Sequence, residues 1–226
     1  MGGKKFWSFK ALDKKTGELT LYGEIASDTW YGDEVTPKEF KADLDKLGDI
    51  DTLNIYINSS GGDVFAGQAI HSMLKRHKAN KNVYIDGLAA SISSVIAMAG
   101  DTIYMPKNAM MMIHNPWTFG LGNAAEFRKL AEDLDKIRES LIVAYEERSA
   151  LTRDEIIKIM DSETWLTADE CFEYGFCDVV EKEKQMAACI DKNLLARYKN
   201  TPEEFLTEEP KPNEQLKQKL LIELEL

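Results

Sequence analysis

The sequence predicts an α/β fold, in which short strands alternate with helices along the chain. Two strand–turn–helix units follow each other directly between residues 53 and 99. Strands that alternate with helices in this way are typical of parallel sheets with helical crossovers. The chain has 226 residues, of which 44% are hydrophobic, so it is long enough for one sizeable core or for a domain followed by a tail.

Three strands and three helices are predicted before residue 100. Leu53, Ile55 and Ile57 alternate with polar residues, which is typical of a half-buried strand. The helix after this strand carries an apolar stripe, and the helix after the next strand is closed by Gly100. The predicted strands are 19–25, 53–57 and 83–85, and the predicted helices are 36–47, 64–74 and 91–99.

The second half of the domain is expected to be more helical. The predicted elements are strands at 102–105 and 109–113, a long helix at about 123–148, helices at 152–160 and 167–174, and a strand at 176–180. The long helix has an apolar seam with a heptad pattern, formed by Phe127, Leu130, Leu134, Ile137, Leu141 and Ala144. This seam predicts packing along another helix. Its spacing leaves open whether that partner belongs to the same chain or to a neighbouring subunit.

The chain changes character after about residue 182. Residues 207–213 are polar and contain two prolines, which predicts a linker, and the sequence from Gln215 permits a short helix. We therefore expect one domain at 1–182 and a charged tail at 183–226, partly disordered or helical. A solvated tail without chemistry is the default interpretation. The alternative is a segment that binds a partner, which rests on leucines at 216, 220, 221, 224 and 226.

Charge and composition exclude several classes of function. A net charge of -11 and a pI near 4.9 leave no basic face for nucleic acid. The first ten residues lack the apolar core of a signal peptide, and Phe6 stands where a myristoylation signal needs Ser or Thr. The longest apolar stretch is too short to span a bilayer. We therefore expect a cytoplasmic protein that binds neither nucleic acid nor membrane.

The cysteines predict neither disulfides nor a metal site. Cys171, Cys177 and Cys189 are an odd number and include no Cys-x-x-Cys pair, which fits a reducing compartment. Cys171 and Cys177 stand among aromatic and aliphatic residues, so we expect small buried side chains there. The sequence indicates no cofactor.

Ser91 is the candidate nucleophile. It stands where a strand and its turn pass into a helix, a position that lifts the hydroxyl clear of the backbone. The amide of Ile92 would then lie at the positive end of the helix, where developing negative charge is stabilised. An ordinary helix N-cap is the alternative interpretation of Ser91. Ser93 and Ser94 lie one turn inside an apolar helix, where packing is their expected role.

The turn at residues 58–63, Asn-Ser-Ser-Gly-Gly-Asp, offers a second oxyanion donor. Gly61 and Gly62 let a backbone amide approach a ligand without a Cβ in the way, which makes the Gly62 amide the candidate. A simple tight turn is the alternative. A phosphate-binding loop is excluded because no Gly-Lys-Ser/Thr follows.

His114 is the candidate general base, because it ends an apolar strand where a side chain would be delivered to a cleft. Serine catalysis needs a base, a group that orients the base and oxyanion donors, and the sequence places these at matching strand ends. Asp161 or Glu163 could orient the imidazole, and sequence reasoning leaves both open. His71 and His77 stand among lysine and arginine residues and are expected to be solvated.

Taken together, these motifs resemble the proteolytic subunit of Clp protease. The resemblance covers about residues 19 to 181, and its motifs fall in the family's order at residues 56–62, 87–91, 112–116 and 168–175. Within that family the closer likeness is to the Clp-like head maturation proteases of tailed phages and prophages. That likeness rests on residues 30–35, 97–101, 114–117 and 163–165.

The resemblance implies both a fold and a site. The fold would be a spiral of β-β-α units of the Clp protease and crotonase type, with the long helix as a protruding handle between rings of subunits. The implied nucleophile is Ser91 and the implied general base is His114. The implied oxyanion donors are the amides of Gly62 and Ile92. Peptide substrate would lie extended beside Asp63, Val64, Pro116 and Trp117.

Two positions depart from the family pattern. Clp subunits usually have Pro where this chain has Ser60, which is a mild change in turn rigidity. They have Asp where alignment on Trp165 places Glu163. Counting back from Trp165 therefore favours Glu163 as the acid that orients His114, and Asp161 remains the alternative.

The sequence thus predicts a cytoplasmic serine endopeptidase that processes scaffold or capsid precursor proteins during phage head assembly. A ring-shaped homo-oligomer is expected, with an ATPase or a capsid-assembly protein as its partner. The alternatives are a general degradative subunit that works with an ATPase, a crotonase-fold acyl-coenzyme A enzyme, and a non-catalytic assembly scaffold. A Ser/Lys dyad that uses Lys107 is a lesser variant.

Overall fold

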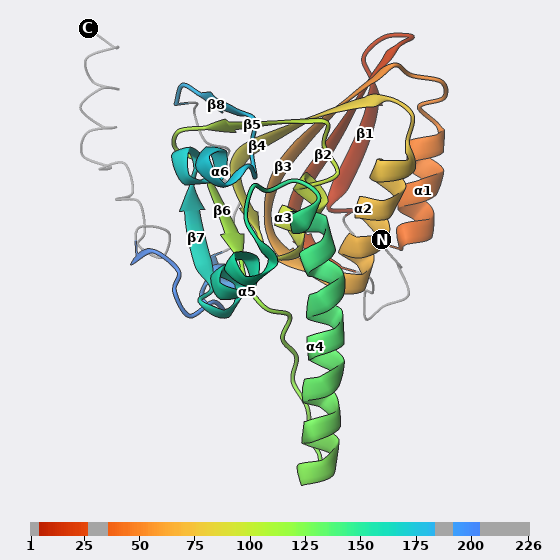
Figure 1. Cartoon of the computed structure of the whole chain (residues 1–226). Coiled ribbons are helices and arrows are strands. Elements are labelled where there is room, and N and C mark those ends of the chain that lie inside the picture. Colours follow the sequence, from red (N-terminus) through yellow and green to blue (C-terminus); the bar gives the residue numbers. More distant parts are fainter. Residues whose placement is uncertain (1–4, 27–35, 184–191, 204–226) are drawn as a thin grey trace, which may run out of the picture.

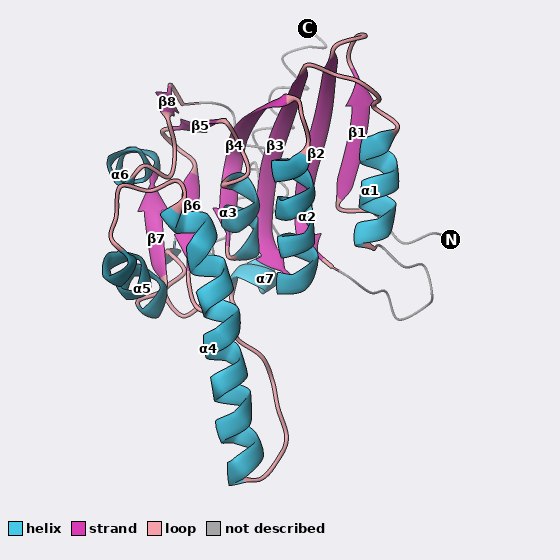
Figure 2. Ribbon diagram, turned by 45° about the vertical axis from the view of Figure 1, so that its right-hand side comes forward, coloured by secondary structure: helices cyan, strands magenta, loops and turns pink. Residues whose placement is uncertain are grey.

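The computed structural model describes residues 5–26, 36–183 and 192–203. A single mixed sheet of eight strands forms its centre, and most of the helices pack on one face of that sheet (Figures 1 and 2). The motif at residues 30–35, Cys189 and the leucines of the tail lie outside the described residues.

The long path of the sheet has the order β1-β2-β3-β4-β5-β8. The first two strands pair antiparallel, and every later pair along this path is parallel. The strands are β1 (Trp7–Ala11), β2 (Thr16–Ile25), β3 (Thr52–Gly62), β4 (Asn80–Ala90), β5 (Thr102–Pro106) and β8 (Val179–Glu181). The predicted last strand therefore begins three residues too early, because Phe176 and Cys177 belong to the buried turn that precedes it.

β4 changes its partner along its length. Its first half pairs with β5, with Asn82 opposite Thr102, and its second half pairs with β6 (Met110–Ile113), with Leu88 opposite Met110. β6 then pairs antiparallel with β7 (Thr164–Thr167). Because β3, β4 and β6 run parallel, their carboxyl ends meet at one edge of the sheet, where the predicted site residues lie.

Capping residues in the sequence fix where several of the helices begin. α1 (Pro37–Asp45), α5 (Arg153–Asp161) and α6 (Ala168–Tyr174) each begin with a capping box, in which Thr at the N-cap and Glu three residues later satisfy each other's backbone amides. Each cap contributes about 1 kcal/mol. α2 (Val64–Arg76) and α3 (Ile92–Ala97) follow β3 and β4 directly, as the two predicted strand–turn–helix units require.

The main core lies between the sheet and helices α1 to α3. Leu53, Ile55 and Ile57 of β3 are fully buried there, so the predicted alternation is confirmed. Cys171 and Cys177 are buried and free, also as predicted, and burial raises the pKa of Cys177 to about 12. Both thiols are therefore small core side chains rather than reactive groups.

The long helix α4 (Ala124–Glu146) has two unequal halves. Leu141 and Ala144 of the predicted seam are buried against the domain. The first half projects away from it, with the loop that precedes it running alongside (Figures 1 and 2), and Phe127 is 49% exposed. Among the described residues, the domain therefore buries only the carboxyl-terminal part of the seam. Across the described ranges, no helix has the length and apolar character needed to cross a membrane.

A short carboxyl-terminal segment, residues 192–203, packs against the domain. It begins with α7 (Lys192–Leu195), and Leu195 is 1% exposed. Leu195 forms a second apolar cluster with Leu88, Ala90 and Met112, separate from the main core. Burying one leucine contributes about 1.5–3 kcal/mol. The expectation of a solvated tail is therefore wrong for this segment, because the apolar face of β4 and β6 gives it a place to dock.

Candidate active site

Ser91 stands between β4 and α3 in an unusual backbone conformation, with φ 56 and ψ -129. Non-glycine residues rarely adopt positive φ, and such strain is often found at functional sites. The amide of Ser91 donates to the Met112 carbonyl at 2.9 Å, which ties the turn to β6. Its side chain makes no capping hydrogen bond to α3, so Ser91 is not an ordinary helix N-cap.

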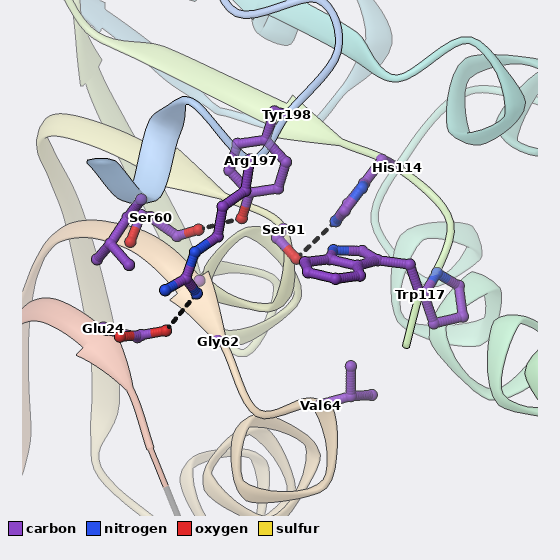
Figure 3. A pocket seen from close by; sticks show the side chains of 12 residues that line it. Glu24, Ser60, Gly62, Val64, Ser91, His114, Trp117, Arg197 and Tyr198 are labelled. Carbon is purple, nitrogen blue, oxygen red and sulfur yellow. Dashed lines mark hydrogen bonds and ion pairs between the residues drawn. The ribbon is translucent and has the colours of Figure 1, made fainter. Parts of the chain in front are cut away.

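His114 directly follows β6, and its Nε2 lies 2.8 Å from the Ser91 Oγ (Figure 3). Burial lowers the pKa of His114 to about 4. The imidazole is therefore neutral near pH 7, where its Nε2 can accept a proton from the serine hydroxyl. A neutral imidazole facing a hydroxyl on a strained turn is the arrangement that general-base activation of serine needs.

The two neighbouring serines are committed to structure. The Ser93 hydroxyl donates to the carbonyls of Ala90 and Ser59 at 2.7 and 3.0 Å. The Ser94 hydroxyl lies 2.6 Å from the Ser91 carbonyl, to which it donates. Both side chains are buried, as expected from their positions inside an apolar helix.

The glycine turn at the end of β3 lies directly against Ser91. A Cβ added at Gly61, which has φ 90, would come 2.6 Å from the Ser91 Cβ. At Gly62, a Cβ would come 2.0 Å from the Ile25 carbonyl oxygen. The Ser59 hydroxyl also accepts a hydrogen bond from the Gly61 amide at 3.1 Å. Gly61 is therefore required for the close approach of β3 to Ser91, and Gly62 for its close approach to β2.

The position of Ile92 is fixed by a second glycine contact. Its side chain packs onto Gly67 of α2, where a Cβ would meet the Ile92 Cγ1 at 2.2 Å. Ile92 is itself 2% exposed and opens α3 immediately after Ser91. Its backbone amide is thus held beside Ser91 at the first turn of a helix, where amides have no intrahelical partner.

These residues line a cleft at the carboxyl ends of β3 and β4 (Figure 3). Three of the four residues expected to contact substrate are on its wall: Val64, Pro116 and Trp117. Asp63 instead caps α2, since its carboxylate accepts a hydrogen bond from the Ala66 amide at 2.7 Å.

The two candidate acids lie near His114 but have other partners. Asp161 accepts hydrogen bonds from Asn115 at 2.8 Å and from Arg138 at 3.5 Å. The Glu163 carboxylate accepts a hydrogen bond from the backbone amide of Asn200 at 2.6 Å. Within the described ranges, neither carboxylate is hydrogen-bonded to the imidazole.

The register of β6 and β7 nevertheless distinguishes the two acids. Ile113 is paired with Thr164 in an antiparallel ladder. Continuing that ladder by one residue brings Glu163 opposite His114. Glu163 also has a left-handed backbone with φ 46, the only positive φ besides that of Ser91 among the non-glycine residues described. Asp161, in contrast, ends α5.

Besides Glu24 of β2, sequence reasoning missed three residues of the cleft. Leu194, Arg197 and Tyr198 line it together with Ser91 and His114. All three belong to residues 192–203, where the helix α7 has only four residues, too few for a periodic signal.

Two further predictions concern residues outside the cleft. His71 and His77 were expected to be solvated, but both are partly buried and burial lowers the pKa of each. Lys107 is exposed on the turn after β5, where its amide donates to the Glu181 carbonyl, and it does not line the cleft.

Comparison with known proteins agrees with this geometry. The model of the Clp protease family matches residues 34–184. The chain belongs to the Clp protease family. It is 30% identical over 140 residues to the ATP-dependent Clp protease proteolytic subunit of Deinococcus radiodurans, covering 61% of this chain and 68% of that one. It is also 30% identical over 154 residues to the same-named subunit of Bacteroides fragilis, covering 66% and 74%.

Family membership confirms the predicted α/β fold, whose sheet is mixed in the structure, and it shows that this protein is a serine peptidase of the Clp type. The match spans both strand–turn–helix units, the handle helix and the strand β8.

Proposed function

We propose that this Clp-family member is an endopeptidase in which Ser91 is the nucleophile and His114 the general base. The observation that carries the proposal is the 2.8 Å contact between the Ser91 Oγ and the His114 Nε2. In the first step the Ser91 oxygen attacks the peptide carbonyl carbon while its proton moves to His114. That proton then goes to the leaving amine, and water repeats the sequence to release the acyl group.

The tetrahedral intermediate needs donors for its oxyanion. We assign these to the amides of Gly62 and Ile92. The Ile92 amide opens α3 next to the nucleophile, and the glycine turn brings the β3 backbone against Ser91. One such donor contributes about 10²–10³-fold to the rate of acyl transfer.

We assign Glu163 as the acid that orients the imidazole. Its support is the antiparallel ladder, which brings Glu163 opposite His114. An extra methylene makes glutamate longer than aspartate, so its carboxylate can reach the imidazole from a slightly more distant backbone. Asp161 is the alternative, and its bonds to Asn115 and Arg138 weigh against it.

The substrate class is protein or peptide in an extended conformation. Such a chain would lie between Val64 and Trp117, along the end of β3, and add a strand to the edge of the cleft. The relatives are named as proteolytic subunits of an ATP-dependent protease. We therefore propose that this chain is a degradative subunit of a ring that receives its substrates from an ATPase. Processing of phage scaffold or capsid proteins stays a prediction from sequence likeness.

Two rival functions are disfavoured. A crotonase-type acyl-coenzyme A enzyme has no use for a hydrogen-bonded serine and histidine, and the family match is to Clp protease. A non-catalytic scaffold would not need the strained backbone of Ser91, which costs about 1–3 kcal/mol.

The proposal is tested by hydrolysis of fluorogenic peptides and of an unfolded protein by the full-length chain and its Ser91→Ala variant. The variant should lose about 10⁴-fold or more of the activity. Ser93→Ala is the matched control, since it removes a neighbouring hydroxyl that only donates to carbonyls, and it should keep the activity. Equal rates for Ser91→Ala and the wild type would contradict the assignment.

The ATPase partner needs a separate test. A tagged folded protein is incubated with this chain and an ATPase fraction from the same cells, with ATP or with a non-hydrolysable analogue. Degradation only with ATP is expected. Equal degradation in both arms would contradict this part of the proposal without affecting the catalytic assignment.

A further inference from the structure

Residues 192–203, the carboxyl-terminal segment, lie across the proposed catalytic pair. The Tyr198 hydroxyl donates to the Ser60 carbonyl at 2.5 Å, in the glycine turn beside Ser91 (Figure 3). The Tyr198 ring meets the His114 ring edge-on, with centroids 5.1 Å apart. Burial raises the pKa of Tyr198 to about 12. The tyrosine therefore contacts the turn and the base, and it lines the cleft together with Ser91.

Polar contacts hold the segment on both sides of this tyrosine. Arg197 forms an ion pair with Glu24 of β2 at 3.0 Å, across the mouth of the cleft (Figure 3). On the other side, the Asn200 amide donates to the Glu163 carboxylate at 2.6 Å, and its side chain donates to the Ser162 carbonyl at 2.8 Å.

An apolar contact anchors the start of the segment. Leu195 is buried in the second cluster, and the Thr201 hydroxyl donates back to the Leu195 carbonyl at 2.7 Å. The segment is thereby folded into a compact turn with Arg197, Tyr198 and Asn200 directed at the site.

These contacts have two consequences for catalysis. Tyr198 lies on the end of β3, where an extended substrate would add its backbone, so the segment and a substrate compete for one place. Asn200 also holds the carboxylate that we assign to orient His114. In the occupied site, Ser91 and His114 are therefore in contact, while the Glu163 carboxylate is hydrogen-bonded to Asn200.

We propose that the cleft over Ser91 and His114 is a binding site for a peptide with an Arg-Tyr-x-Asn sequence, filled in this chain by its own residues 197–200, and that this segment must leave before a protein substrate enters. The inference rests on the proposed function of the site. It assigns each side chain a recognition partner: Glu24 for arginine, the Ser60 carbonyl for the tyrosine hydroxyl, and the Ser162 carbonyl for the asparagine side chain. A free peptide of this sequence would be a competitive inhibitor.

The first test is hydrolysis of a short fluorogenic peptide by full-length variants. Tyr198→Ala should raise the rate at low substrate concentration by about tenfold or more, because it favours the open cleft. Asn200→Ala should raise it less, because it removes only the side-chain hydrogen bonds to the carbonyls of Ser162 and Glu163 and keeps the backbone amide. Lys199→Ala is the matched control, since Lys199 is exposed between the two contact residues. Folded Tyr198→Ala and Asn200→Ala variants with unchanged or lower rates would overturn the inference.

The ion pair permits a charge-exchange test. Arg197→Glu and Glu24→Arg should each raise the rate, and the double variant should return it toward the wild-type value because the pair is restored with opposite polarity. Additive effects of the two changes would contradict a direct contact.

Adding the segment in trans tests the sequence preference of the site. A synthetic peptide with the sequence of residues 192–203 should inhibit the Tyr198→Ala variant competitively. The same peptide with alanine at the tyrosine position should inhibit at least tenfold more weakly, which corresponds to about 1.4 kcal/mol. Equal inhibition by both peptides would contradict recognition of the tyrosine.

A readout that needs no catalysis separates this inference from the proposed function. The His114 ring is followed by NMR titration, with its signals identified by their loss in His114→Gln. Its midpoint should lie near pH 4 in the wild type and move toward the ordinary histidine value of about 6.5 in Tyr198→Ala. An unchanged midpoint would overturn the placement of the segment. A shifted midpoint in a protein with no peptidase activity would instead contradict the proposed function alone.

Discussion

The two halves of the proposed catalytic centre are built in different ways. The half with Ser91 and His114 is fixed by the backbone: Ser91 is tied to β6 through the Met112 carbonyl, and the glycine turn presses against it. The half with Glu163 depends on a flexible carboxylate that the described structure shows bonded to Asn200. The first half is preformed, whereas in our proposal the second is completed only when the Glu163 carboxylate turns to the imidazole.

The activation of Ser91 by His114 therefore depends on different contacts from the orientation of the His114 imidazole. A serine and histidine in contact can already exchange a proton. Full activity also needs an acid that fixes the imidazole tautomer and stabilises the imidazolium. Changes in the first half should therefore act on the resting protein, and changes in the second half should show their full effect only when the cleft is open.

The largest effect is expected from removing the charge of the acid. In the Tyr198→Ala background, Glu163→Gln should lower kcat on the order of 10⁴-fold, because glutamine cannot stabilise the imidazolium. Asp161→Asn is the matched control and should keep most of the activity, since Asp161 bonds to Asn115 and Arg138. Loss of activity in Asp161→Asn with retention in Glu163→Gln would place the acid two residues earlier.

A smaller effect is expected from disturbing the preformed half. Gly61→Ala should lower kcat by about 10²-fold, because its new methyl group must move Ser91 from a 2.6 Å overlap, and misplacement by about 1 Å costs that much. Gly48→Ala is the control, with a positive φ of 71 but no atom within 4 Å. It should cost stability alone. Equal activity of the two variants would mean that the turn does not position Ser91.

Burial of the His114 imidazole should make the free energy of unfolding depend on pH. The His114 pKa is about 4 in the fold and about 6.5 in the unfolded chain, so the unfolded chain binds more protons between these values. The free energy of unfolding should therefore fall as pH drops from about 6.5 to about 4. His71 and His77 also have lowered pKa values, so chemical denaturation of the wild type is compared with His114→Gln. A variant with the same pH dependence as the wild type would contradict this burial.

The smallest effect on the cleft is expected from changes in the projecting first half of α4, the predicted handle. We predict that the projecting half of α4 packs on a second subunit, so Phe127→Glu should lower the particle mass in light scattering and leave the melting temperature nearly unchanged. Lys136→Glu adds negative charge on the opposite side of the helix and should keep the assembly. A monomeric wild type would refute the prediction and leave the projecting half solvated.

Sequence reasoning found the preformed half because its signals are local. The glycine turn, Ser91 and His114 each follow an apolar strand within a few residues, and parallel strands bring their ends together. The strands β1 and β7 were missed. In the case of β7, the strand has only four residues and lies between two helices. The contact between Tyr198 and Ser60 joins residues 138 positions apart, which no periodic pattern predicts. The carboxylate of Glu163 was placed by register, but its hydrogen bond to Asn200 depends on that same distant packing.

The most direct test of a preformed Ser91 and His114 pair is labelling with a fluorophosphonate probe, followed by mass spectrometric mapping of the modified residue. We predict one modified residue, Ser91, in the full-length chain, faster labelling in Tyr198→Ala, and none in Ser91→Ala. His114→Ala should keep the fold and label far more slowly, because the proton acceptor is lost. Labelling that persists in Ser91→Ala, at Ser93 or Ser94, would contradict the account.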